Sequence, residues 1–390
     1  MSTIKVNKLE HTSTTDGGIQ LDNAGHVTVD GQQMPTAGAL SNRNLIINGA
    51  MQVSQRETSS DVNSEDKFTL DRFRTEYSAG TFECTVTQES DGPQGFNKSL
   101  KVACDTTYTP LTSDNFGITT HLEGQDLQSL GFGSAGAKDL TLSFYVKGTA
   151  KQYSCALNFV DSSSNKYIQT RSFNVTSSWQ RVVLTFEGNG AALNTAIKDS
   201  ENLGLEIQWW LAAGPDDIFA EDTTWVANSS PTFHAVTGQE NFFDNTSNEF
   251  YITGVQLEVG KKATPFEHKS YGDELARCQR YFQKYREPRL RGTGGGSTNL
   301  NRFGMTLPVT MRQAPTLTST GTFAWYDGTG IGTINTFTTS YMFPDSIELD
   351  SANSVSQPNA MTGTTAASRA LTVYNSNNVY SGEILLNAEL

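Results

Sequence analysis

The sequence predicts a mainly β protein, with an antiparallel β-sandwich, one short helix and a β-rich C-terminal domain. Apolar and polar residues alternate at period two in many short runs, as in strands with one buried face. Only 36% of the 390 residues are hydrophobic and 18% are charged, and the 34 glycines suit many turns better than long helices. A single stretch, after residue 270, changes to helical spacing.

The net charge and the absence of long apolar stretches narrow the classes of function. A net charge of −13 opposes binding to nucleic acid, which requires clustered Lys and Arg. No stretch has the apolar length of a transmembrane helix, and the first residues lack the apolar core of a signal peptide. We therefore expect a protein made in a cytoplasm, without membrane insertion and without a nucleic-acid partner.

The four cysteines lie far apart in the sequence and form no C-x-x-C pair. A zinc site needs closely spaced ligands, which this chain lacks. We expect reduced, mostly buried small hydrophobes, no metal site and no cofactor. The positions are Cys84, Cys104, Cys155 and Cys278.

Turn residues interrupt residues 1–41 every few positions, between short runs such as Ile19-Gln20-Leu21 and His26-Val27-Thr28-Val29. Strands this short bury no core alone. The segment is expected to dock into another protein or to wrap with two further copies of itself, and a floppy tail is the alternative.

Residues 42–270 contain the clearest alternation and predict an antiparallel sandwich. Each run has an apolar and a polar face. The runs are Ser99–Ala103, Leu140–Val146, Tyr153–Phe159, Arg181–Phe186, Leu203–Ile207 and Phe250–Ile252.

Residues 271–291 follow steps of three and four and predict a helix, with Ser270 as its cap and Pro288 at its end. Residues 272–291 contain six basic and three acidic groups, so this stretch is basic although the chain as a whole is acidic. Nucleic-acid binding is one reading, but packing between helices of an oligomer explains the stretch more simply. The apolar stripe is Leu275, Cys278, Phe282 and Tyr285.

Residues 292–390 open on a glycine-rich break and contain nine charged residues against 27 Ser and Thr. This composition suits small or intertwined β domains with subunit contacts, and it also suits a surface that faces glycans.

Three further features of the sequence could suggest a function, but each has a plainer structural interpretation. Gly131 to Gly136 match G-x-G-x-x-G, but a strand pattern follows instead of the helix that a dinucleotide site needs, so we predict a loop. The five histidines are isolated, and we expect no catalytic residues. An acidic cluster at 216–222 contains Asp216, Asp217, Glu221 and Asp222; glycoside hydrolysis and calcium binding are possible roles, and a solvated loop is the plainer one.

Aromatic residues are the candidates for glycan binding, because sugar rings stack their C–H faces on aromatic planes. Trp209 and Trp210 are neighbours, so on a strand they point to opposite faces, one predicted buried and the other exposed. Trp225 lies beside the acidic cluster.

Several strings together resemble phage fibre proteins, in the same order along the chain. They are 44–51 (NLIINGAM), 70–73 (LDRF), 250–260 (FYITGVQLEVG), 264–268 (TPFEH), 273–281 (DELARCQRY), 307–316 (LPVTMRQAPT) and 387–390 (NAEL).

Residues 44–260 also resemble jelly-roll carbohydrate-binding modules. The likeness rests on 98–102 (KSLKV), 142–148 (LSFYVKG), 178–182 (SWQRV) and the closing strand. Such modules often hold a structural calcium through acidic residues that here read Ala50-Met51-Gln52 and Thr253-Gly254, so we expect no calcium site.

The resemblance implies a homotrimeric tail fibre that is part of the virion and attaches to the host. Residues 1–41 would bind a tail adaptor, nozzle or hub protein, 42–270 would form the jelly roll, 271–291 the trimer neck, and 292–390 the C-terminal β domain. The partner would be a host surface glycan or lipopolysaccharide. Further contact candidates in the last domain are Trp325, Tyr326, Tyr341 and Tyr374.

Three other functions remain open: a fibre-borne polysaccharide depolymerase, a head fibre or decoration protein without a receptor role, and a free lectin-like module of a cell. A depolymerase usually has a long repetitive β-helix, and no internal repeat is visible. A free lectin would need a secretion signal. We therefore expect a binding protein and not an enzyme.

Overall fold

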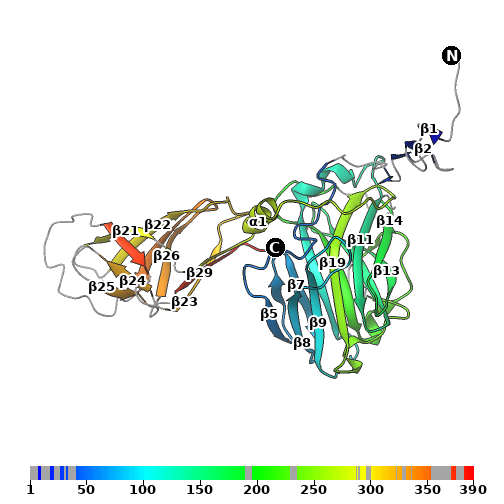
Figure 1. Ribbon diagram of the computed structural model, residues 1–390, viewed down its shortest axis with the longest axis horizontal. Coiled ribbons are helices and arrows are strands. Elements are labelled where there is room, and N and C mark those ends of the chain that lie inside the picture. The colour runs from blue at the N-terminus through cyan, green and yellow to red at the C-terminus, as the bar shows by residue number, and fades with distance from the viewer. Residues whose placement is uncertain are drawn as a thin grey trace, which may run out of the picture. The chain divides into compact units, whose positions relative to one another are not determined.

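The chain forms two compact units, Met1–Tyr271 and Gly272–Leu390, in a computed structural model (Figure 1). The structure describes residues 8–9, 18–21, 27–29, 32–33, 41–188, 196–228, 235–286, 288, 290–295, 300–321, 323–326, 331–334, 336–352, 370–374 and 382–390.

Four very short strands lie at the N-terminus and pair in the order β1-β2-β3-β4, all antiparallel. Their apolar side chains remain exposed, with Leu9 at 59%, Ile19 at 44%, Leu21 at 41% and Val29 at 38%. The four strands are β1 (Lys8–Leu9), β2 (Ile19–Leu21), β3 (Val27–Val29) and β4 (Gln32–Gln33).

Two antiparallel sheets stack face to face to form the sandwich of the first unit (Figure 1). The seven-stranded sheet has the order β17-β13-β12-β15-β10-β7-β6 and the six-stranded sheet the order β14-β11-β19-β9-β8-β5. This arrangement confirms the predicted mainly β, sandwich fold class.

All six predicted runs lie within the strands of the sandwich, which outnumber them. These strands are β5 (Ser59–Asn63), β6 (Lys67–Leu70), β7 (Phe73–Ala79), β8 (Glu83–Glu89), β9 (Ser99–Thr106), β10 (Asn115–Glu123), β11 (Leu140–Gly148), β12 (Lys151–Val160), β13 (Lys166–Val175), β14 (Gln180–Phe186), β15 (Leu203–Ala213), β17 (Val226–Ala227) and β19 (Glu249–Val259). The short strands β16 (Ile218–Phe219) and β18 (Ala235–Val236) pair in parallel. Three 3-10 helices lie between strands: η1 (Gly124–Leu130), η2 (Pro215–Asp217) and η3 (Phe242–Asp244).

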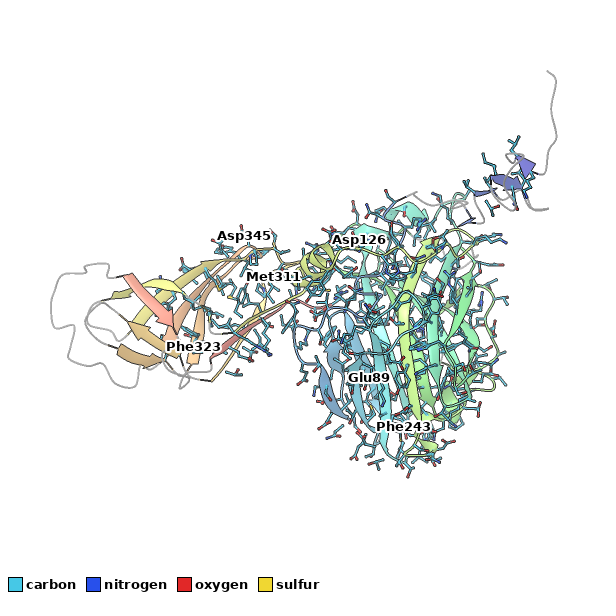
Figure 2. All side chains as sticks on the ribbon, viewed as in Figure 1. Glu89, Asp126, Phe243, Met311, Phe323 and Asp345 are labelled. Atoms are coloured by element: carbon cyan, nitrogen blue, oxygen red, sulfur yellow. The ribbon has the colours of Figure 1, made fainter. Side chains whose placement is uncertain are left out.

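One continuous aromatic-rich core fills the space between the two sheets. Phe82 packs against Phe116 and Phe243 at centroid distances of 5.6 and 4.9 Å, and Phe144 meets Trp209 edge to face. Phe243 is labelled in Figure 2. Large rings in offset and edge contacts stabilise beyond the area they bury. Packed aromatic side chains therefore form the centre of the first unit.

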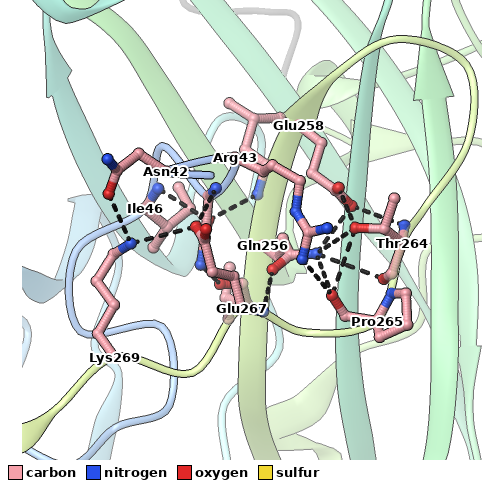
Figure 3. Close-up of polar contacts among 12 residues, drawn as sticks. Asn42, Arg43, Ile46, Gln256, Glu258, Thr264, Pro265, Glu267 and Lys269 are labelled. Carbon is pink, nitrogen blue, oxygen red and sulfur yellow. Dashed lines mark hydrogen bonds and ion pairs between the residues drawn. The ribbon is translucent and has the colours of Figure 1, made fainter. Parts of the chain in front are cut away.

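Hydrogen bonds join Asn44, where the chain enters the sandwich, to residues 255–267, where it leaves (Figure 3). The Asn44 amide donates to the Val255 carbonyl at 3.0 Å, and its side-chain oxygen accepts from Leu257 N at 3.1 Å. Glu267 accepts from Asn44 N at 3.0 Å and from Lys269 at 3.2 Å. These bonds fix residues far apart in sequence, so the TPFEH string has a structural role.

The second unit contains one short helix and two sheets, ordered β20-β29-β23 and β25-β24-β28-β21-β22-β27-β26. Its core includes Phe303, Phe323 and Phe337, with Phe323 and Phe337 at 4.8 Å (Figure 2). The elements are α1 (Tyr271–Gln279), β20 (Phe282–Arg286), β21 (Arg291–Gly295), β22 (Leu300–Thr306), β23 (Thr316–Thr320), β24 (Phe323–Tyr326), β25 (Ile331–Ile334), β26 (Thr336–Met342), β27 (Ser346–Ala352), β28 (Ala370–Tyr374) and β29 (Glu383–Asn387).

The helix predicted over 271–291 is wrong in its second half. Helix α1 ends at Gln279, and residues 282–286 form strand β20, paired with β29. Two of the six basic groups lie in this ladder, where Lys284 and Arg286 pair with Glu383 at 2.9 and 3.2 Å. A pattern of steps of three and four over so few residues does not separate helix from strand.

Candidate functional site

Two aromatic side chains stand out on the surface of the second unit. Tyr341 is 56% exposed and Phe343 is 54% exposed, while Met342 between them packs against the core. Tyr341 lies in β26, and Phe343 follows the last residue of that strand, so the two exposed rings are close in the chain. They lie at the hairpin of β26 and β27, where Phe343 N donates to the Ser346 carbonyl at 2.9 Å and Asp345 lies in the turn (Figure 2).

A group of charged side chains lies on the adjoining strands. Glu348 is the cross-strand neighbour of Tyr341, and Asp350 is the cross-strand neighbour of Arg302. Arg302 donates to both carboxylate oxygens of Asp350, at 3.0 and 3.5 Å, and Glu348 lies 3.9 Å from Arg302. Planar guanidinium and carboxylate groups bind hydroxyls in fixed directions. We call Tyr341, Phe343, Arg302, Glu348 and Asp350 the aromatic patch.

The three tryptophans proposed from the sandwich sequence do not form a glycan surface. Trp209 and Trp210 are 0% and 1% exposed, so the prediction that one of them is exposed is wrong. Trp209 lies in the main core, whereas Trp210 points to the other face and packs with Ala156 and Ile168 in a smaller cluster. Trp225 is 3% exposed, and its indole donates to the Glu187 carbonyl at 2.6 Å.

Of the four aromatic candidates in the second unit, Tyr341 is the one whose side chain the structure describes. The backbones of the other three lie in β24 and β28, and their side chains lie outside the described residues. These are Trp325, Tyr326 and Tyr374.

The proposed trimer stripe is not a single helical face. Cys278 lies on α1 and Phe282 on β20, and both are buried in the single chain. Leu275 and Tyr285 are half-buried, and Tyr285 packs against the core of the second unit. The stripe is therefore shared between two elements, and the trimer stays a prediction.

An aromatic pair missed by the sequence reading lies on the outer face of the six-stranded sheet. Trp179 and Tyr251 are half-buried, with ring centroids 6.2 Å apart. Lys147 lies over both rings, at 5.5 and 4.6 Å, and Lys101 lies 5.4 Å from the Tyr251 ring. These cations already contact the ring faces. The exposed aromatic patch is thus the better platform for a sugar.

A buried polar row crosses the outer face of the seven-stranded sheet. Glu206 is its centre: it bonds His121 Nε2 at 2.8 Å and accepts from Asn158 at 3.1 Å. Gln208, on the same face of β15, donates to Glu76 at 3.3 Å. Within the described residues, Asn158 Oδ1 and Gln208 Oε1 are buried without a hydrogen-bond partner. Two acceptors in the row are therefore left to a water molecule or a ligand hydroxyl.

The two carboxyl groups of the polar row differ in pKa. Burial, and then the charge of Glu206, raise the pKa of Glu76 to about 8. Burial alone would raise the pKa of Glu206, but the hydrogen bond and charge of His121 outweigh it and lower that pKa to about 2. The pKa values of the two carboxyl groups are thus shifted in opposite directions.

The acidic cluster at 216–222 separates into independent contacts. Asp217 is buried and accepts from the Asn115 amide at 2.9 Å, and burial raises the pKa of Asp217. Glu221 accepts from Ser172, and the Asp222 carbonyl accepts from Arg171. Among the residues that the structure describes, no three His, Cys, Asp or Glu side chains gather as metal ligands.

The remaining motifs have structural explanations. Gly131 and Gly133 adopt positive φ in a loop that leads into strand β11, as predicted. At Met51 and Gln52, the Gln88 amide donates to both backbone carbonyls, at 2.7 and 3.1 Å. Within the described part of the chain, no helix has the length and hydropathy to cross a bilayer.

Comparisons with known proteins find similarity at the level of solved structures. No known protein family and no curated protein matches the chain. The enzymatically active domain of bacteriophage CBA120 tailspike protein 4 is similar at 12% identity and a TM-score of 0.30, over 55% of this chain and 21% of that one. The chain thus spans about a fifth of that protein's length.

Carbohydrate-binding modules are also found. The family 11 module of cellulase Lic26A-Cel5E of Clostridium thermocellum is 13% identical with a TM-score of 0.26, over 54% of this chain and 98% of that one. TmCBM61, solved with β-1,4-galactotriose, is 11% identical with a TM-score of 0.24, over 56% of this chain and 99% of that one. Similarity at this level does not assign a function to the chain.

Proposed function

We propose that this protein is a phage tail fibre that attaches the virion to its host by binding a surface glycan or lipopolysaccharide, without catalysing a reaction. The aromatic patch carries the proposal. It combines two rings that are more than half exposed with an Arg302–Asp350 fork on neighbouring strands. Exposed aromatic surface beside oriented polar groups is the chemistry that a sugar ring requires.

The N-terminal segment supports an attachment role. Leu9, Ile19, Leu21 and Val29 are exposed on strands of two or three residues, which bury no core. Burial of this apolar surface against a tail adaptor, nozzle or hub protein would stabilise it. Residues 1–41 are therefore proposed as the virion attachment segment, in a protein made in the host cytoplasm.

Glycan binding is tested with a double variant, Tyr341→Ser with Phe343→Ser. We expect binding to host cells and to purified surface polysaccharide to fall at least about tenfold, because aromatic anchors dominate binding energies. The matched control, Leu111→Ser with Val183→Ser, removes two side chains exposed at 63% and 48% in the sandwich and should leave binding unchanged. Equal binding by the double variant and the unmodified protein would refute the proposal.

The virion location has a separate test. Labelled antibody against this chain, imaged on purified particles, should decorate the tail. Decoration of the head would instead favour a head fibre, and decoration of neither would remove the virion role.

A depolymerase is the second candidate, and the polar row favours it. The pKa of Glu76 is raised and that of Glu206 is lowered, and glycoside hydrolysis uses two carboxyl groups whose pKa values differ in this way. Incubation with host polysaccharide, followed by analysis of the products, separates the two functions. Release of oligosaccharides that is abolished by Glu206→Gln would establish the enzyme.

A further inference from the structure

The fold brings two cysteines together that are 20 positions apart in the sequence. Cys84 on β8 and Cys104 on β9 are directly opposite each other in the antiparallel ladder. Both side chains are buried in the core of the sandwich, and both thiols are free. Neither feature is visible from the spacing of the cysteines.

The hydrogen-bond pattern fixes which kind of cross-strand pair this is. Cys104 N donates to the Asn248 carbonyl at 3.1 Å, away from β8. Because the N–H and C=O of one strand residue point to the same side, Cys104 makes no ladder bond to Cys84. Such non-hydrogen-bonded pairs have Cα atoms about 4.5 Å apart and the closer side chains. This separation lies within the roughly 4.4–6.8 Å range of disulfides.

We infer that Cys84 and Cys104 are a site of reversible oxidation, at which a low-molecular-weight disulfide such as oxidised glutathione forms a cross-strand disulfide. One cysteine thiolate attacks glutathione disulfide and releases one glutathione. The other thiolate then attacks the mixed disulfide and releases the second. Two protein thiols are oxidised and one glutathione disulfide is reduced to two thiols, which take up the protons.

The surroundings of the two thiols make them slow to react while β8 and β9 stay paired. Burial, with Asp105 nearby, raises the pKa of the Cys84 thiol, and burial raises the pKa of Cys104 to about 11. The Cys104 thiol also donates to the Thr106 carbonyl at 3.4 Å, a hydrogen bond that a disulfide would remove. Thiolates, and not thiols, attack disulfides.

The position of the pair provides a route for the oxidant. The ladder changes register between Glu83 and Cys84, so the pair lies next to a bulge near the ladder's end. Strand β8 is covered on its other side by the short edge strand β5. Ends of ladders open more easily than their centres. Local opening there exposes both thiols together.

The other two cysteines provide an internal comparison. Cys155 is opposite Trp209 on β15 and Arg171 on β13, and Cys278 is on helix α1. Neither has a thiol as its cross-strand neighbour. Oxidation should therefore link Cys84 to Cys104, and the remaining two should at most take up glutathione.

The test uses the unmodified full chain incubated with oxidised glutathione near pH 8, then digested without reductant and analysed by mass spectrometry. We expect one linked peptide pair, Cys84 to Cys104, lighter by two hydrogens than its separate peptides. The thermal midpoint should rise by about 5–10 °C, because the bond closes a loop of about 20 residues, and dithiothreitol should reverse it. A Cys155→Val variant should behave identically.

Two results would overturn the inference. One is a lasting glutathione adduct on Cys84 or Cys104 without a link between them. The other is no linked peptide at a temperature where hydrogen exchange shows that β8 and β9 have opened. Cys104→Val should abolish the link, but the mapping on the unmodified chain decides the outcome even if that variant fails to fold.

Discussion

At the scale of single residues, the same chemical group plays different parts according to the face it occupies. Trp209 and Trp210 are adjacent, yet Trp209 packs in the main core and Trp210 in a smaller cluster on the other face of the sheet. Tyr341 remains exposed on the edge of a sheet. Burial thus separates the aromatic residues that hold the fold from those available to a ligand.

Glu76 gives a residue-scale prediction about pH. Its pKa is raised from 4.5 to about 8, so the folded protein keeps a proton that the unfolded chain loses above pH 4.5. The contribution of Glu76 to the free energy of unfolding is therefore complete below pH 4.5 and is lost as the pH rises to about 8. Because some of its surface stays exposed, we expect Glu76→Gln to stabilise by only about 2 kcal/mol at pH 9.

Urea unfolding at pH 4 and pH 9 measures this difference. The variant and the unmodified protein should be alike at pH 4, and the variant should be more stable at pH 9. Glu65→Gln, at a side chain that is 50% exposed, is the control and should show no such dependence. A pH-independent effect of Glu76→Gln would contradict the pKa assignment.

At the scale of elements, strand pairing overrules a local helical pattern. Phe282 to Arg286 are spaced as a continuation of α1, yet they form the edge of a three-stranded sheet with β29 at its centre. The last strand of the chain therefore holds β20 and β23 together. The C-terminal residues matter for the second unit because of this central place.

Adjacent leucines on β29 test the importance of this strand. Leu386 is fully buried and Leu385 is half-buried on the other face. We expect Leu386→Ala to cost about 2–5 kcal/mol, because it leaves a cavity, and Leu385→Ala to cost much less. Hydrogen exchange in peptides covering residues 282–286 and 316–320 should speed up in the first variant. Equal effects of the two substitutions would show that β29 is not packed as described.

At the scale of the whole molecule, the exposed apolar side chains of β1 to β3 favour assembly. We predict a trimer with three times the 42.5 kDa mass of one chain, since three copies would cover surface that one leaves in water. Light scattering of the purified protein measures the mass directly, with a chain lacking residues 1–41 as comparison. A mass of 42.5 kDa for the full chain would exclude the trimer.

A trimer would also explain how weak sites become effective. Three patches on one particle convert later binding events into intramolecular ones, which can raise avidity by about 10²–10⁴. Single patches therefore need not bind tightly for attachment to be firm.

The sequence by itself determined the six alternating runs that lie within strands of the sandwich, because alternation at period two is a local property of the chain. It also determined the loop at 131–136 and the buried state of the cysteines. Only the tertiary structure decided what lies beside each strand. The register between β8 and β9 places Cys84 opposite Cys104. Pairing with β29 makes residues 282–286 a strand where the sequence predicted a helix. Both depend on contacts between residues far apart in the chain, which local periodicity does not encode.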